Sequence, residues 1–136
     1  MIFVDTGYLL ALLNPRDELH ERAQAWAGSV SESLLTTEYV LWELVNSLSM
    51  PIDRPKAHMA AEAIRNDPSW EYLSATQDLF EAGLQFHRDR KDKAWSLTDC
   101  ISFHVMSQRR IPSSLTYDHH FEQAGFVALL RRDPEV

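Results

Sequence analysis

The sequence predicts an α/β fold built on a mainly parallel central sheet of four to five strands. Short apolar runs alternate along the chain with longer segments of helical periodicity, and this alternation is typical of strand–helix–strand crossover units. The chain has 136 residues, which is the size of one domain. We therefore expect residues 1–136 to form a single domain, without repeats or an internal linker.

The first part of the chain is expected to hold one strand and two helices. Residues 2–5 are rich in β-branched and aromatic side chains and predict a short buried strand. Residues 6–13 place their large apolar side chains on one side, as an amphipathic helix does. Asn14 and Pro15 interrupt that helix and predict a second one, which is capped by Asn14, begins at Pro15 and ends near Gly28.

The middle of the chain predicts two strands that flank a pair of helices. Residues 33–36 form a short run with an apolar centre, which indicates a strand. Residues 37–49 carry an apolar stripe at helical spacing, and Pro51 ends that helix. A further helix is expected over residues 55–66, where an Asp-Pro pair stops it, and residues 70–73 predict the third strand.

The last part of the chain continues the alternation. Residues 76–90 have a broad apolar face and predict a helix, whereas residues 98–110 are apolar nearly all round, which indicates a helix buried on most sides. Residues 113–117 predict a strand, and residues 118–124 predict a short helix that is stopped by a glycine. Residues 126–130 complete the sheet as the expected last strand.

Composition restricts the setting in which the protein works. No apolar run approaches the ~18 residues that suggest a membrane span, and the single cysteine, Cys100, suits a reducing compartment. We expect a cytoplasmic protein without membrane association. The formal net charge of −7 argues against a nucleic-acid partner unless the acids are concentrated in a metal site. Basic residues gather at 88–93, 109–110 and 131–132, either as solvated helix ends or as a rim that contacts phosphate.

Four acidic residues stand at the ends of expected elements. Asp5 and Asp118 directly follow strands, Asp99 opens a helix, and Glu43 lies beside an apolar helical stripe. Parallel sheets bind ligands at the carboxyl ends of their strands, so we expect these acids to converge there. Clustered carboxylates repel one another unless a cation such as Mg²⁺ is shared between them. A cation of this kind also lowers the pKa of bound water, which would make the chain a metal-dependent nuclease.

Each acid also has a local explanation. Ser96 and Asp99 have the spacing of a capping box, in which the acid only ties down a helix start, and Asp118 could cap its short helix. His119 and His120 beside Asp118 raise the possibility of a transition-metal site. We rank that site below a magnesium site, because adjacent histidines rarely face the same way and carboxylates suit harder ions.

The chain resembles a PIN domain, most closely the VapC-like toxin branch, along residues 2–130. Four blocks in order carry the resemblance: Ile2 to Thr6, Thr36 to Asn46, Ser96 to Cys100, and Leu115 to Phe121 followed by Gly125 and Phe126. The resemblance implies a three-layer α/β/α sandwich that cleaves RNA phosphodiesters with Mg²⁺ or Mn²⁺. It implies that the catalytic metal ligands are Asp5, Glu43, Asp99 and Asp118, with polar support from Thr6, Asn46 and Thr116.

The same resemblance implies partners other than the RNA substrate. A small antitoxin is expected to bind over the acidic pocket and to offer an arginine to its carboxylates. A homodimer is also expected, with candidate contacts on exposed apolar surface near Trp26, Tyr39 and Trp42.

Three other functions were weighed. Asp5, Thr6 and Gly7 match the Asp-Thr-Gly signature of aspartic proteases, but those enzymes pair two aspartates on an almost wholly β fold, which the expected helices exclude. A metal-dependent phosphatase is disfavoured because the chain lacks an Asp-x-Asp nucleophile pair. A non-catalytic PIN-fold module that binds RNA or protein stays open. Loss of an acid would favour that module, and none is missing.

Overall fold

The computed structural model describes residues 1–135 and is organised around one sheet of five parallel strands. The strands are β1 (Ile2–Val4), β2 (Leu34–Thr37), β3 (Trp70–Leu73), β4 (Ser113–Leu115) and β5 (Val127–Ala128). They lie in the order β3-β2-β1-β4-β5, and each neighbouring pair is parallel. The predicted parallel sheet is therefore confirmed, with β1 at its centre.

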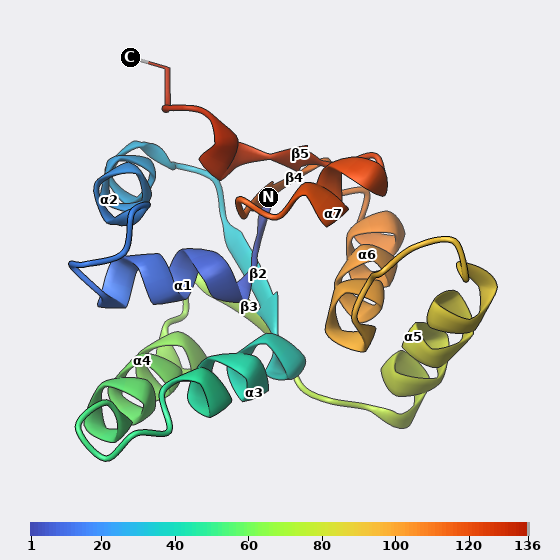
Figure 1. Cartoon of the computed structure of the whole chain (residues 1–136), viewed down its shortest axis with the longest axis horizontal. Coiled ribbons are helices and arrows are strands. Elements are labelled where there is room, and N and C mark those ends of the chain that lie inside the picture. Colours follow the sequence, from blue (N-terminus) through green and yellow to red (C-terminus); the bar gives the residue numbers. More distant parts are fainter. Residues whose placement is uncertain (136) are drawn as a thin grey trace.

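Helices cover both faces of this sheet. They are α1 (Thr6–Leu13), α2 (His20–Ser29), α3 (Glu38–Ser47), α4 (Arg54–Asn66), α5 (Gln77–Asp89), α6 (Leu97–Arg109) and α7 (His119–Gln123), followed by a 3₁₀ turn, η1 (Leu129–Arg131). In Figure 1, α1, α2 and α4 lie to the left of the sheet, and α5 and α6 lie to the right. This three-layer arrangement follows from the strand order. The chain moves outward from β1 to β3 and then crosses back to β4, so right-handed crossovers place the two sets of helices on opposite faces.

The strand order also locates a binding edge. The chain leaves β1 toward one side of the sheet and reaches β4, the other neighbour of β1, by a later crossover. Open parallel sheets bind ligands outside the carboxyl ends of strands at such a reversal. The segments that follow β1 and β4 are therefore the ones to inspect for a site.

The start of the second helix was predicted wrongly. α2 begins at His20 and not at Pro15, and the intervening residues form turns. The Asn14 side chain accepts a hydrogen bond from the backbone N–H of Arg16 at 3.0 Å, and the Asp17 side chain accepts one from Leu19 at 2.8 Å. Asn and Asp side chains stabilise turns in this way, and here that preference prevails over the helix-starting preference of proline.

The last strand is also shorter than expected. β5 ends at Ala128, and the chain turns into η1, where Leu129 and Leu130 are buried. The backbone N–H of Leu130 donates to the carbonyl of Thr116 at 3.0 Å. The last two residues of the expected strand over residues 126–130 thus form a turn, which packs its leucines inward and braces the segment after β4.

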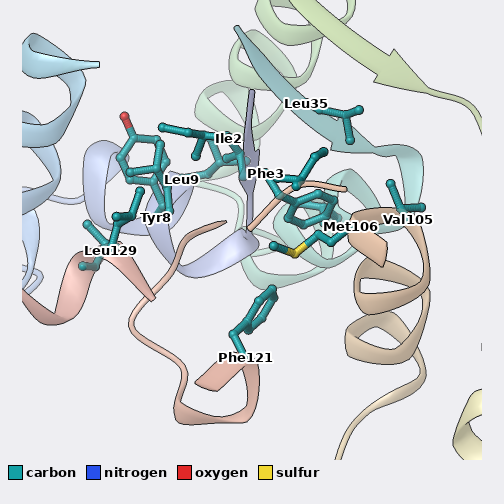
Figure 2. Close-up of a cluster of buried hydrophobic side chains, with 14 of the residues drawn as sticks. Ile2, Phe3, Tyr8, Leu9, Leu35, Val105, Met106, Phe121 and Leu129 are labelled. Atoms are coloured by element: carbon teal, nitrogen blue, oxygen red, sulfur yellow. The ribbon is translucent and has the colours of Figure 1, made fainter. Parts of the chain in front are cut away.

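The core joins strands to the helices on both faces. Phe3 of β1 and Leu35 of β2 are fully buried and belong to one hydrophobic cluster with Phe121 of α7, as Figure 2 shows. Phe103 of α6 meets Phe121 edge to face, with ring centroids 4.9 Å apart. Such contacts add roughly 0.5–1.5 kcal/mol per aromatic pair beyond the area that they bury. They hold α6 and α7 together at the β4 side of the sheet.

The exposed aromatic surface expected near Trp26, Tyr39 and Trp42 is only partly present. Trp42 of α3 is 55% exposed, but Tyr39 is 7% exposed, so the expected exposure of Tyr39 is wrong. The Tyr39 hydroxyl donates to the carbonyl of Thr76 at 3.1 Å. Trp26 is half-buried and donates from its indole to the carbonyl of Arg132 at 2.9 Å.

None of the helices in the described chain combines the length and apolarity that crossing a bilayer requires.

The packing of α5 on α6 yields a test at Gly83. A Cβ added at Gly83 would overlap Ile101 Cγ1 and lie 3.3 Å from Leu97 Cδ1. Gly83→Ala is expected to lower the free energy of unfolding by ~1–3 kcal/mol, because overpacking in a filled core outweighs the ~1 kcal/mol gain in helix propensity. Gly28→Ala in α2 is the control, since a Cβ there meets nothing within 4 Å. Urea unfolding measures both variants. Equal stabilisation by both would contradict the close packing at Gly83.

Candidate active site

Asp5 lies at the centre of the binding edge. It follows β1 directly and is 7% exposed, at the N-cap position of α1. Its side chain makes no capping hydrogen bond to the helix it precedes. Thr116, which follows β4, donates from Oγ1 to Asp5 Oδ2 at 2.9 Å. This contact joins the ends of the two strands at the point where the strand order reverses.

Glu43 reaches the same edge from α3. The helix follows β2 directly, and the side chain of Thr37, the last residue of β2, caps it by accepting from the backbone N–H of Val40. Thr6, the residue after Asp5, donates from Oγ1 to Glu43 Oε1 at 2.7 Å. The support predicted for Thr6 thus corresponds to a specific contact, which orients the glutamate toward the edge where Asp5 lies.

Asp99 is held at the start of α6. Ser96 accepts from the backbone N–H of Asp99 at 3.0 Å, and Asp99 Oδ2 accepts from the backbone N–H of Ser96 at 3.3 Å. The expected capping box is therefore present. The Asp99 side chain is nevertheless only 13% exposed, so the cap also fixes a buried carboxylate next to the other acids.

Asp118 also combines a cap with a place in the cluster. Its Oδ1 accepts from the backbone N–H of His120 at 2.9 Å and so caps α7. Its own backbone N–H donates to Thr116 Oγ1 at 3.1 Å. The Thr116 hydroxyl therefore contacts two of the acidic residues: it donates to the Asp5 carboxylate and accepts from the Asp118 backbone N–H. Capping and clustering are compatible explanations, because a cap determines where the carboxylate points.

His120 is a member of the cluster that the sequence analysis did not include. Its Nδ1 lies 3.2 Å from Asp118 Oδ1 and 3.4 Å from Asp99 Oδ2. The nitrogen is buried and has no hydrogen-bond partner in the described chain, because neither carboxylate meets it at a favourable angle. The histidine pair after Asp118 was the available signal, but only the fold brings Asp99 to the same ring.

Charge repulsion and burial change the acidity of the site. Burial and, to a smaller extent, the charges of Asp99 and Glu43 raise the pKa of Asp5 to about 7, against the hydrogen bonds from Thr116 and the Thr6 backbone. Burial also raises the pKa of Asp99, and the charge of Asp118 adds to that effect. These couplings show that the four predicted acids, two of them more than 90 residues apart in the sequence, form one electrostatic cluster.

The cluster has the donor set for a hard divalent cation. Within residues 1–135, no lysine or arginine nitrogen comes within 4.0 Å of any of the four carboxylates. One oxygen of each carboxylate is anchored by a donor of the chain itself. Anchored, partly enclosed oxygen ligands without a lysine or arginine partner suit Mg²⁺ or Mn²⁺, which bind carboxylates while keeping several waters.

Asn46 lies apart from these contacts. It lines a groove of about 560 Å³ beside α3, together with Trp42, Arg65 and Tyr72. Among residues 1–135 its side chain has no hydrogen bond to the carboxylates. The supporting role that the family resemblance implies for Asn46 stays a prediction.

The basic groups are partly neutralised by neighbouring acids. Arg90 and Lys93 lie within ion-pair distance of Asp92. Arg109 pairs with Glu71, and Arg131 pairs with Glu122. Exposed pairs of this kind are weak, so they exchange readily, but they leave little unpaired positive charge at these positions. Among them, Arg131 is of interest because it stacks over Tyr117, directly beside Asp118, with 4.3 Å from Cζ to the ring centroid.

The fold agrees with the known proteins that the chain resembles. Residues 2–127 match the PIN domain family, and the chain belongs to that family. The 23S rRNA-specific endonuclease VapC20 of Mycobacterium tuberculosis is 32% identical over 127 residues, which cover 93% of this chain and 96% of the relative. The expected PIN and VapC-like resemblance is therefore confirmed.

Solved structures give the same result. The crystal structure of Mycobacterium tuberculosis VapC20, described as a sarcin–ricin loop cleaving toxin, matches with a TM-score of 0.85 at 31% identity, over 93% of this chain and 97% of that one. FitAcB from Neisseria gonorrhoeae shares the fold with a TM-score of 0.68 at 20% identity, over 94% and 95% of the two chains. A toxin–antitoxin complex from Klebsiella pneumoniae has a TM-score of 0.68 at 15% identity, over 98% and 100%. The predicted α/β/α sandwich is confirmed. The exclusion of an aspartic protease is supported, because Asp5 follows the central strand of a parallel sheet that helices flank.

The raised pKa of Asp5 predicts how stability depends on pH without metal. Between the ordinary pKa of 3.8 and the folded value of about 7, the folded protein binds more protons at Asp5 than the unfolded chain does. Stability is therefore lost as pH rises through this window, by up to about 4 kcal/mol. Asp5→Asn should remove this loss, so that the variant unfolds at a higher temperature than the wild type at pH 8 in EDTA.

Thermal unfolding across pH 5–8 tests this expectation. The advantage of Asp5→Asn should shrink toward pH 5, where Asp5 is already protonated in the fold. Asp78→Asn, an exposed acid of α5, is the matched control and should follow the wild type. Parallel pH profiles for wild type and Asp5→Asn would show that Asp5 is not strained by its surroundings.

Proposed function

We propose that this protein is a metal-dependent endoribonuclease that hydrolyses RNA phosphodiester bonds and acts as the toxin of a toxin–antitoxin pair. The observation that carries the proposal is the gathering of Asp5, Glu43, Asp99 and Asp118 at one sheet edge, without a lysine or arginine partner within residues 1–135. The relative VapC20, a 23S rRNA-specific endonuclease, supports RNA as the substrate. It also makes 23S rRNA the first RNA to test.

The proposed role of each carboxylate follows from how far its side chain is buried. Asp5 and Asp99 are the most enclosed and are assigned as direct ligands of Mg²⁺ or Mn²⁺. Glu43 and Asp118 complete the site, directly or through water. When bound, the cation neutralises phosphate charge and makes a water molecule a better nucleophile at neutral pH. Thr6 and Thr116 keep Glu43 and Asp5 in place through their hydroxyl groups, so the ligands need little rearrangement to bind.

The open side of the site offers contacts to RNA. Tyr117 is 44% exposed immediately before Asp118, and an exposed aromatic ring can stack on a base. Arg131 lies over that ring and can exchange its exposed partner Glu122 for a phosphate. These two residues are proposed to position the strand beside the acids, which compensates in part for the acidic charge of the protein.

An antitoxin is proposed as a protein partner of this activity. A small antitoxin is expected to cover the acids and to place an arginine among them, where a cation is missing from the chain itself. The structural relatives include a toxin–antitoxin complex, which supports this partner. We place the activity in the cytoplasm, where the buried Cys100 would stay reduced.

The central test is RNA cleavage by the purified protein. Cleavage of 23S rRNA is expected with Mg²⁺ or Mn²⁺ and should stop in EDTA. Asp5→Asn and Asp99→Asn should lower the rate by at least about 100-fold, because residues that only orient metal ligands already cost about 10–100-fold. Thr116→Val should fall in that smaller range, since it removes the hydroxyl that anchors Asp5 and accepts from the Asp118 backbone N–H, but no carboxylate.

The control for cleavage is Asp78→Asn, which should retain the wild-type rate. Cleavage that persists in EDTA, or in both acid variants, would point to a contaminating nuclease or to another mechanism. RNA binding without cleavage in wild-type protein would favour a non-catalytic PIN-fold module.

A homodimer is proposed through α3, where Trp42 presents a large exposed apolar side chain. Light scattering should give twice the chain mass of 15.7 kDa. Trp42→Glu should shift the protein toward the monomer, because it places a charge in an apolar contact. Phe80→Glu, another exposed aromatic residue at 40% exposure, is the control. A wild-type monomer at all concentrations would rule the dimer out.

A further inference from the structure

The structure brings together a second set of possible metal ligands at the edge of the acid cluster. One ligand atom from each of Asp118, His119 and His120 lies within 4.8 Å of the other two. The sequence analysis expected the two histidines to face different ways, and this is wrong. Their ring centroids are 4.4 Å apart, because the first turn of α7 carries both rings toward Asp118.

The separations match those between ligands around a small cation. His120 Nδ1 lies 3.2 Å and His119 Nδ1 lies 3.7 Å from Asp118 Oδ1. Asp99 Oδ2 lies 3.4 Å from His120 Nδ1. Zinc ligands at about 2.0–2.1 Å in a tetrahedron are roughly 3.3 Å from one another. Asp118, His119 and His120 therefore need only small movements to share one ion, and Asp99 adjoins this group through His120.

The hydrogen bonding of His120 points the same way. Its buried Nδ1 has no partner in the described chain, although two carboxylate oxygens lie within 3.4 Å. Ionised carboxylates only accept hydrogen bonds, so in the tautomer that leaves Nδ1 without a proton its lone pair would face acceptors alone. A metal ion between these atoms would satisfy the nitrogen and both oxygens at once.

The ligand types separate this set from the all-oxygen half of the site. Mg²⁺ prefers oxygen ligands, whereas imidazole suits zinc and similar transition-metal ions. The path to these ligands is open, because the His119 side chain is 59% exposed and that of Asp118 is 34% exposed. Asp99 and His120 form the enclosed side, at 13% and 22% exposure.

We propose that Zn²⁺ binds at Asp118, His119 and His120, beside Asp99, and that it inhibits the nuclease by occupying Asp118 and crowding Asp99, two carboxylates that the Mg²⁺ site needs. The inhibitory effect rests on the function proposed above, whereas the binding does not. The ion competes for Asp99 and Asp118, so the site couples activity to the supply of a transition metal.

Calorimetric titration of the untagged full-length protein with Zn²⁺ tests the binding. One Zn²⁺ per chain is expected. His119→Ala and His120→Asn should each weaken binding by at least about tenfold, because each removes one nitrogen ligand. His58→Ala, an exposed histidine of α4, is the control and should bind as the wild type does. Circular dichroism verifies that each variant is folded, and His119→Ala removes an exposed side chain that folding does not need.

Absence of Zn²⁺ binding, or equal affinity in wild type and both histidine variants, would overturn the site. Inhibition is measured separately, as the fraction of each variant's own Mg²⁺-supported cleavage that Zn²⁺ removes. Zn²⁺ should inhibit the wild type and His58→Ala at concentrations at least about tenfold lower than His119→Ala, in line with its expected loss of affinity. Zn²⁺ that binds without inhibiting would overturn the competition. Because calorimetry requires no cleavage, a failed nuclease assay and a failed zinc site are distinct results.

Discussion

The central constraint on this structure is that it holds several carboxylates close together at the carboxyl ends of its strands, where water reaches them only in part. Asp5 is buried at the end of the central strand, and its neighbours Asp99 and Glu43 add negative charge to the same region. Burial of a carboxylate is unfavourable unless a cation or hydrogen bonds compensate. Here the hydrogen bonds compensate incompletely, and the raised pKa of Asp5 records the remainder. The donor set of this cluster therefore fits a cation supplied from outside the chain.

The same contacts that build local structure also aim the carboxylates. Asp99 completes the cap of α6, Asp118 caps α7, and Thr116 ties Asp118 to Asp5 through one hydroxyl. Each cap hydrogen bond uses one carboxylate oxygen and fixes the orientation of the whole carboxylate group. Aromatic packing between Phe103 and Phe121 then fixes α6 relative to α7. Preorganisation of this kind lets a cation bind without first ordering its ligands.

Histidines at the rim change what such a cluster can accept. A purely carboxylate site favours hard cations, while His119 and His120 add nitrogen ligands on the exposed side. Asp118 belongs to both halves and Asp99 adjoins the histidines, so the two preferences are coupled. Under the proposed zinc site, metal selectivity would be decided at α7, a helix of 5 residues, and not at the central strand where Asp5 lies.

The sequence alone determined the elements and the identity of the acids. Apolar runs and helical periodicity are local signals, and they located β3 at residues 70–73 and α1 at residues 6–13 with the bounds that the structure has. The four acids were recognisable because each interrupts or ends an apolar segment. Competition between local signals produced the errors, as at Asn14, where a turn prevails over a helix start.

Tertiary structure decided which of these side chains meet. The contact from Thr6 to Glu43 spans 37 residues and that from Thr116 to Asp5 spans 111. No periodicity reports such pairs, because they arise from the strand order and from the packing of α3 and α7 at one edge. The approach of His120 to Asp99 has the same origin. Sequence spacing indicates which side chains share one face of a helix or strand. Only the assembled sheet determines which side chains of other elements they contact.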